Sequence, residues 1–251
     1  MLTALTAHQL LLLGAAACVG GAIFGIAGFA FGVIASLFLH HGFVATDVIF
    51  IVVAGALVLN IGLLPRFWSE IDFRKSLPFL VGATVGLPIG LALLSWLEPR
   101  LIRSFVGVLL VSYCAFALRQ HSRQPLRFSA GGGRAADVSI GMVGGVVGGV
   151  SGLGPLLPGI WYGLRGMSKT EQRGLMQPFG LYVQGLMVAW FIATGTVSSS
   201  AVQSVAVATP VMLVAAWLGL RVFDGMSTAR FQRFVIAAAM VGSVFLLVRQ
   251  L

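Results

Sequence analysis

The sequence predicts an all-α polytopic membrane protein. Hydrophobic residues make up 58% of its 251 residues and charged residues only 9%, and the mean hydropathy is +1.00. A soluble domain carries about 25% charged residues, so this composition excludes an ordinary soluble protein. Apolar stretches of the length that crosses a bilayer, about 20 residues, recur along the whole chain. We therefore expect one membrane domain over residues 1–251.

The hydrophobic residues fall into eight segments, arranged as two four-segment repeats in residues 1–124 and 125–251. The segments are residues 10–39, 44–64, 77–97, 101–118, 138–163, 175–194, 201–220 and 231–248. The first and the fifth are long, and glycines interrupt both. Pro155 and Pro158 also remove backbone donors from the fifth, which stops a continuous helix there. The polar stretch 119–136 is the natural linker between the halves.

One glycine pattern occurs in both halves. Four glycines recur 124 residues further along the chain: Gly20, Gly21, Gly25 and Gly28 match Gly144, Gly145, Gly149 and Gly152. Glycines that interrupt hydrophobic segments at matching positions of two halves indicate the binding site of a secondary transporter. The reason is that a broken helix frees backbone groups, which a membrane protein tolerates only in a protein-buried or water-lined cavity.

The basic residues favour one topology. A net charge of +9 would suggest nucleic acid in a soluble chain, but here it is better explained by positively charged cytoplasmic loops. If all eight segments cross once, the 16 Lys and Arg divide evenly between the two sides. If the first and fifth segments are re-entrant, 13 of the 16 lie on one side, and the halves form an inverted repeat. This arrangement places Arg66, Arg123, Lys169 and Arg230 in the cytoplasm; eight simple crossings remain the alternative.

Ordered motifs in both halves resemble the sulfite exporter TauE/SafE family. They include Gly25-Ile-Ala-Gly28-Phe-Ala-Phe-Gly32, Asp72-Phe-Arg before Pro78, Gly149-Val-Ser-Gly152-Leu-Gly154-Pro155, and Met167-Ser-Lys169 through Arg173. The resemblance covers essentially the whole chain. It implies a multi-pass permease of the bacterial inner membrane for sulfite, organosulfonates or related organic anions, in either direction. Many members have a denser glycine run where this chain has Phe29, Ala30 and Phe31, which leaves open whether both halves bind ligand equally.

The glycine-rich turns are the first candidates for substrate binding. Helix N-termini present unpaired N–H groups and partial positive charge, which attract anions. We therefore expect a small anionic substrate to bind between the two glycine-broken helices, with Ser151 adding a hydroxyl donor. The residues concerned are Gly25, Gly28, Gly149, Ser151, Gly152 and Gly154. The alternative is that these glycines only allow close helix packing.

Four polar residues complete the candidate site. Asn60 and Gln184 either line a cavity or hydrogen-bond between helices. Arg173 and Gln177 are one helical turn apart and could face a cytoplasmic entrance. Arg173 would steer anions there, or would serve as a topology charge at the lipid headgroups.

Acidic residues offer no proton relay. All seven, Asp137 among them, fall in or beside expected loops, which favours a uniporter or a carrier driven by the anion gradient. We expect no metal and no cofactor. The expected partners are a small anionic substrate and the lipid bilayer, with no nucleic acid, and the oligomeric state stays open.

Two other classes of function remain. Gly149-Val-Ser-Gly152 fits the nucleophile motif of rhomboid intramembrane proteases, which also requires a histidine base near the serine. The four histidines, His8, His40, His41 and His121, all lie at segment ends or in loops, so we expect no enzyme. The third class is a non-transporting assembly partner for another membrane protein.

Overall fold

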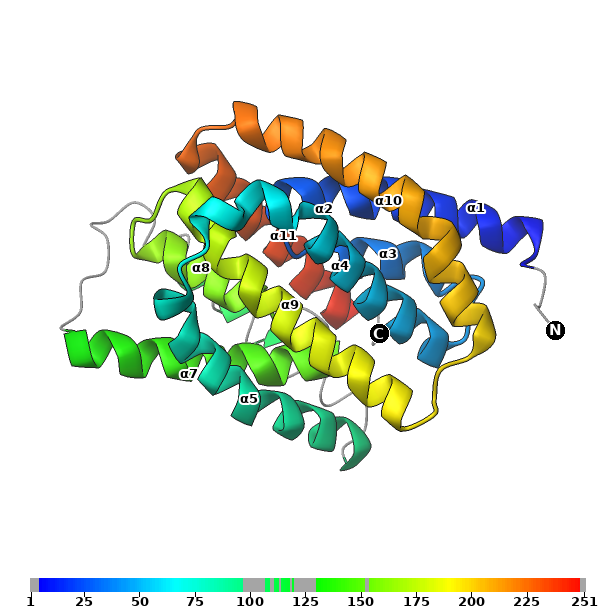
Figure 1. Ribbon diagram of the computed structural model, residues 1–251, viewed down its shortest axis with the longest axis horizontal. Coiled ribbons are helices and arrows are strands. Elements are labelled where there is room, and N and C mark those ends of the chain that lie inside the picture. The colour runs from blue at the N-terminus through cyan, green and yellow to red at the C-terminus, as the bar shows by residue number, and fades with distance from the viewer. Residues whose placement is uncertain are drawn as a thin grey trace. The chain divides into compact units, whose positions relative to one another are not determined.

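The computed structural model describes residues 5–96, 107–108, 111–112, 114–117, 119, 130–151 and 154–248. Over these ranges the chain forms helices and no strand, as its composition predicts (Figure 1). The elements are α1 (Ala7–Ala15), the π-helical η1 (Ala16–Gly20), α2 (Gly21–Ala27), α3 (Phe31–Leu39), α4 (Ala45–Phe67), the 3-10 helix η2 (Trp68–Glu70), α5 (Phe73–Trp96), α7 (Ala130–Ser151), α8 (Leu156–Leu164), α9 (Lys169–Ala193), α10 (Ser199–Gly225) and α11 (Thr228–Val248).

Five helical stretches in the described part of the chain are long and apolar enough to cross a membrane. They are Ala7–Ala27, Ala45–Glu70, Phe73–Leu93, Lys169–Ala193 and Ser199–Gly225. In contrast, α3 and α8 have nine residues each. Nine residues span only about 14 Å at 1.5 Å per residue, less than half of a bilayer core. The segment predicted over 101–118 lies mostly outside the described residues.

The chain divides into two compact units, and each contains parts of both sequence halves. Unit 1 is Met1–Arg66 with Gly180–Gly225, and unit 2 is Phe67–Phe179 with Met226–Leu251. Unit 1 therefore holds the first glycine-broken segment and α10, while unit 2 holds the second and α5. Neither unit coincides with one half of the sequence.

In unit 1, α10 runs parallel to η1 and α2, the orange helix beside the blue ones in Figure 1. Glycines on the α2 side make this close approach possible. A Cβ at Gly21 would lie 2.7 Å from the carbonyl oxygen of Met212, and a Cβ at Gly25 would collide with that of Ala216. Small residues at such positions let two backbones pack in direct contact.

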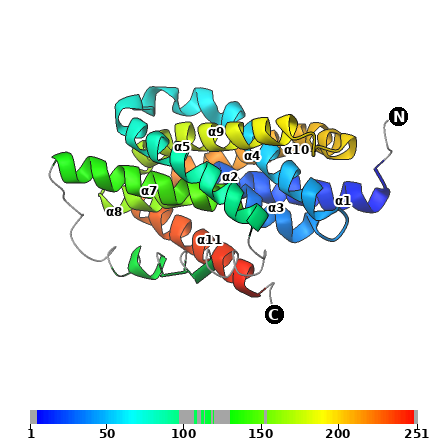
Figure 2. The same ribbon diagram turned by 90° about the horizontal axis from the view of Figure 1, so that it is seen from below.

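In unit 2, α5 runs parallel to α7 in the same manner (Figure 2). Glycines face backbone here as well: Gly145 lies against Ala83, where an added Cβ would be 2.9 Å from the Ala83 Cα. Each unit therefore pairs a glycine-broken helix from one half of the sequence with the third long helix of the other half.

Candidate functional site

The first glycine-broken segment forms a helical hairpin. Gly28 ends α2 with φ of +89°, a conformation that suits glycine, and its N–H donates to the Phe24 carbonyl at 2.7 Å. The chain then returns along α1, because α3 packs on η1 and α1, and Gln9 Nε2 donates to the Gly42 carbonyl at 2.9 Å. The end of the hairpin, at Gly42, therefore lies beside its beginning, at Gln9.

An aromatic ring fills the inner side of this first hairpin. Phe31, at the start of α3, is 2% exposed. Its ring lies 2.9 Å from where a Cβ of Gly20 would be, and 2.7 Å from where a Cβ of Gly55 would be. The two glycines therefore form the walls that hold Phe31, and ring atoms occupy the space beside this turn.

The second hairpin is filled by a ring from a different helix. An added Cβ at Gly144, the repeat equivalent of Gly20, would lie 3.0 Å from the ring of Phe179 on α9. A Cβ at Gly154 would be 2.9 Å from the Gly144 carbonyl oxygen and 3.5 Å from the same ring. Position 179 is the repeat equivalent of Gly55. The ring that fills the glycine pocket therefore comes from α3 in the first half and from α9 in the second, at positions that are not equivalent in the repeat.

Packing already accounts for several predicted site glycines without a ligand. Gly25 lies against α10, and Gly149 faces α5, where a Cβ would be 3.1 Å from the Leu87 carbonyl oxygen. Gly154 packs inside its own hairpin. Gly152 lies outside the described residues, as does the side chain of Ser151, the last residue of α7. Ligand binding at the two turns stays a prediction.

A partly buried ion pair holds the base of the second hairpin. Asp137 is 8% exposed and accepts a hydrogen bond from Trp161 Nε1 at 2.8 Å. Arg165 Nη1 donates to both Asp137 oxygens, at 2.9 and 3.1 Å. The expectation that Asp137 lies in or beside a loop is wrong: α7 begins at Ala130, and Asp137 is two turns inside it. Sequence reasoning missed this cluster because its members are 24 and 28 residues apart.

Arg173 is completely buried. The exposed fraction of its side chain is 0%, and its guanidinium carbon lies 4.7 Å from the centroid of the Phe67 ring. Gln177, one turn further along α9, is 2% exposed. A charge at the lipid headgroups would be exposed, so the topology-charge interpretation of Arg173 does not fit this position. The repeat equivalents of these two residues on α4 are Ile49 and Val53, so one half alone carries this buried polar pair.

The other predicted pair forms a direct contact inside unit 1. Asn60 Nδ2 donates to Gln184 Oε1 at 2.6 Å and to the Ala56 carbonyl at 3.1 Å. Both side chains are buried, at 1% and 3% exposure. Of the two expectations for these residues, the structure contains the interhelical hydrogen bond.

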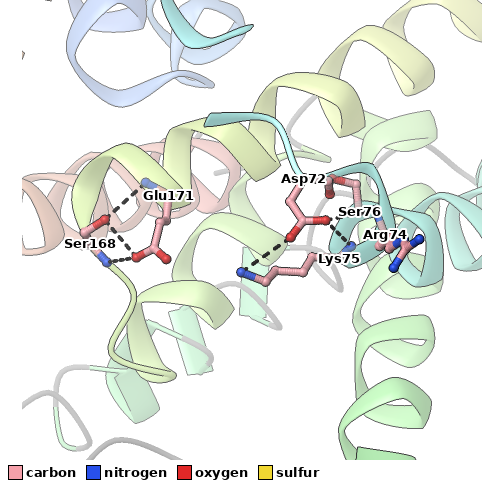
Figure 3. A network of polar contacts seen from close by, with 6 residues as sticks. All are labelled: Asp72, Arg74, Lys75, Ser76, Ser168 and Glu171. Atoms are coloured by element: carbon pink, nitrogen blue, oxygen red, sulfur yellow. Dashed lines mark hydrogen bonds and ion pairs between the residues drawn. The ribbon is translucent and has the colours of Figure 1, made fainter. Parts of the chain in front are cut away.

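The Asp72 and Ser168 motifs cap two helices outside the apolar spans (Figure 3). Asp72 Oδ1 accepts the backbone N–H groups of Arg74 at 3.0 Å and Lys75 at 3.1 Å, at the start of α5. Ser168 and Glu171 cap the start of α9 reciprocally: Ser168 Oγ accepts the Glu171 N–H at 3.3 Å, and the Ser168 N–H donates to Glu171 Oε2 at 2.9 Å. The backbone N–H of Lys75 and the positive charge of its side chain hold the pKa of Asp72 below its ordinary value of 3.8.

The family whose description is "Sulfite exporter TauE/SafE" matches residues 12–246. The chain belongs to this family. No curated protein and no solved structure gives a significant match. Membership in the TauE/SafE family, together with five apolar helices of membrane-spanning length, makes the chain a multi-pass membrane transporter.

Proposed function

We propose that this TauE/SafE protein is a secondary transporter that moves small anions across the bacterial inner membrane. Sulfite and organosulfonates are the first substrates to test, with related organic anions next. The whole chain would act as one transporter domain, because the single helix α9 contributes residues to both compact units. The direction of transport is left to the flux assay.

The observation that carries this proposal is the complete burial of Arg173 in a transporter family with anionic substrates. Removing a cation from water is costly unless an anion or hydrogen-bond acceptors compensate it. The planar guanidinium can donate two parallel hydrogen bonds to two oxygens of one oxyanion, which a lysine ammonium cannot. An amide nitrogen of Gln177, on the same face of α9, would add a neutral donor.

The glycine turns would supply backbone donors to the same kind of ligand. Gly149, Ser151, Gly152 and Gly154 remain candidates in the second hairpin, because freed N–H groups attract oxyanions. Gly25 and Gly28 are weaker candidates, since the Phe31 ring occupies the space within the first hairpin. We assign Asn60 and Gln184 primarily to the hydrogen bond between α4 and α9, and only secondarily to ligand binding.

Two contacts inside unit 1 support the re-entrant topology. In unit 1, Arg66 Nη2 lies 2.8 Å from Asp224 Oδ1, so the ends of α4 and α10 lie together. Asp47, at the opposite end of α4, accepts a hydrogen bond from Ser198 at 2.7 Å. The re-entrant topology places Arg66 and the loop after α10 on the same, cytoplasmic side. Both pairs agree with that placement.

Cysteine labelling in whole cells tests that topology. With Arg66 and Lys169 replaced one at a time by cysteine, neither position should react with an impermeant reagent added outside. Labelling of position 169 from outside, with position 66 protected, would restore eight simple crossings.

The other classes of function are less well supported. Neither a protease nor an assembly partner explains why a transporter family covers nearly the whole chain. Transport activity of the purified protein would exclude a purely assembling role.

Thermal unfolding with a panel of anions tests the proposed function. A ligand that binds only the folded protein stabilises it by about 2.7 kcal/mol at a hundred times its Kd. Sulfite or a sulfonate should raise the Tm of the wild type and not that of Arg173→Gln. Arg230→Gln, which changes an exposed arginine, is the matched control and should keep the shift. Equal shifts in all three proteins, or none in the wild type with any anion, would contradict the proposal.

A further inference from the structure

A groove of about 480 Å³ runs along the seam between η1–α2 and α10 in unit 1. Its floor includes two small side chains, Ala22 and Ala215. Cys18 forms one wall, and Val211, Val214 and Leu218 belong to the other. Every one of these side chains is apolar or only weakly polar, so the groove cannot hold a charged ligand along its length.

The close approach of the two helices explains why the groove exists. Gly219 on α10 lies directly against the Ala22 carbonyl, and Gly25 on α2 against that of Ala216. Two helices held together by glycine contacts leave a furrow beside the seam when the residues next to it are also small. The larger side chains of Val214 and Leu218 stand at its edge.

The groove is open at the surface of unit 1. Val214 is 61% exposed and Leu218 is 51% exposed, and Cys18 is also exposed. Both helical stretches, Ala7–Ala27 and Ser199–Gly225, have the length and hydropathy of membrane spans. At membrane depth the surrounding medium is acyl chains, so exposed valine and leucine side chains contact lipid.

A positive charge lies beyond one end of the groove. Arg221, one turn after Leu218, is exposed, and its guanidinium carbon lies 3.7 Å from the centroid of the Trp217 ring. Tryptophan and arginine at a helix end are typical of the membrane interface, where phospholipid headgroups lie. Arg66 and Asp224, at the same end of the unit, pair with each other.

We propose that this groove binds one acyl chain of an anionic phospholipid, whose phosphate is held by Arg221. The acyl chain would fill the furrow over Ala22 and Ala215, and Trp217 would fix the plane of the guanidinium beneath the headgroup. The site would be occupied while the transporter works, because it lies outside the candidate anion site of unit 2. It is independent of the proposed substrate.

Cys18 provides a natural probe for this site. The full-length protein, purified in detergent, is titrated with phosphatidylglycerol or with phosphatidylcholine of the same acyl chains, and alkylation of Cys18 by a maleimide is followed. Cys18→Ser gives the background from Cys114, which is buried. Phosphatidylglycerol should slow alkylation of Cys18 more effectively than phosphatidylcholine does.

Two variants separate the two parts of the site. Val214→Trp fills the groove at an exposed position and should abolish lipid protection. Arg221→Gln should raise the concentration of phosphatidylglycerol needed by roughly fivefold, which corresponds to about 1 kcal/mol for one basic residue at a membrane surface. It should not change the effect of phosphatidylcholine. Val202→Trp, on the same helix and 52% exposed in the wild type, is the control and should behave like the wild type.

Three outcomes would overturn the proposal. In the first, alkylation does not depend on lipid. In the second, Val214→Trp retains full protection. In the third, protection rises with protein concentration rather than lipid concentration, which would mean that a second copy of the chain covers the groove.

Discussion

Asn60 and Gln184 are 124 residues apart in the chain, and their side-chain amides meet at 2.6 Å. The same offset of 124 relates the glycines of the two broken segments. Asn60 therefore contacts its own repeat equivalent. Contacts between equivalent residues are characteristic of positions near a two-fold axis, so this pair supports the inverted repeat that the charges predict.

The amide pair predicts a specific pattern of stability. Asn60→Leu leaves the buried Gln184 amide without this partner and should lower the free energy of unfolding by about 1–3 kcal/mol. The double variant Asn60→Leu with Gln184→Met removes both polar groups and should recover part of that loss. Thermal unfolding in detergent measures both. If the single variant lost transport but kept its stability, a ligand role would be preferred.

Gly28 should not tolerate a side chain. Its φ of +89° places an alanine in the left-handed region, which costs roughly 1–2 kcal/mol. Gly28→Ala should therefore lower the Tm. Gly14→Ala is the matched control, because Gly14 is helical with no atom within 4 Å of an added Cβ; this change should be neutral or stabilise by up to about 1 kcal/mol. A neutral Gly28→Ala protein would show that the turn has another conformation.

The Asp137 cluster should stabilise the second hairpin more than a surface ion pair does. Asp137→Asn weakens two charge-assisted contacts at a buried position, and we expect a loss of about 1.5–3 kcal/mol. Asp224→Asn is the control, because the side chains of Arg66 and Asp224 are 44% and 47% exposed and such pairs contribute less than about 1 kcal/mol. Equal losses in the two variants would contradict the proposed importance of the hairpin base.

The Asp72 cap predicts a dependence on pH. Because the pKa of Asp72 is lowered in the folded protein, its ionised form contributes stability that is fully present above 3.8, the ordinary value. That contribution is lost as the pH falls through the lower, folded-state pKa. Asp72→Ala should cost about 0.5–2 kcal/mol at neutral pH, as loss of a helix cap does. The difference should shrink towards pH 3, and a constant difference would argue against a role for the charge.

The sequence predicted the helical membrane class and the position of the first break. It could not predict that Phe31 fills one glycine pocket while Phe179 fills the other, because the two rings come from different elements of the repeat. The burial of Arg173 was missed because the sixth hydrophobic segment was expected to begin at residue 175, whereas α9 begins at Lys169. The spacing of Arg173, Gln177 and Gln184, which places all three on one face of a helix, was the signal in the sequence that could have indicated this burial.

Ser151 offers a sharper test of ligand binding at the second turn than the glycines do. A side chain at Gly154 would lie too close to the Gly144 carbonyl, so loss of transport in Gly154→Val would not separate packing from binding. Ser151→Ala is a cleaner change. A lost hydrogen bond to a charged ligand contributes about 1.5–3 kcal/mol, so the affinity should fall roughly tenfold to a hundredfold.

Flux of labelled sulfite and sulfonates into or out of liposomes that contain the purified protein is the most direct test of anion transport. The wild type should carry at least one of these anions, Arg230→Gln should match it, and Arg173→Gln should lose most of the flux while still inserting. Arg173→Lys should recover only part, because an ammonium lacks the planar pair of donors. Absence of flux for every anion in the wild type, or undiminished flux in Arg173→Gln, would contradict this account.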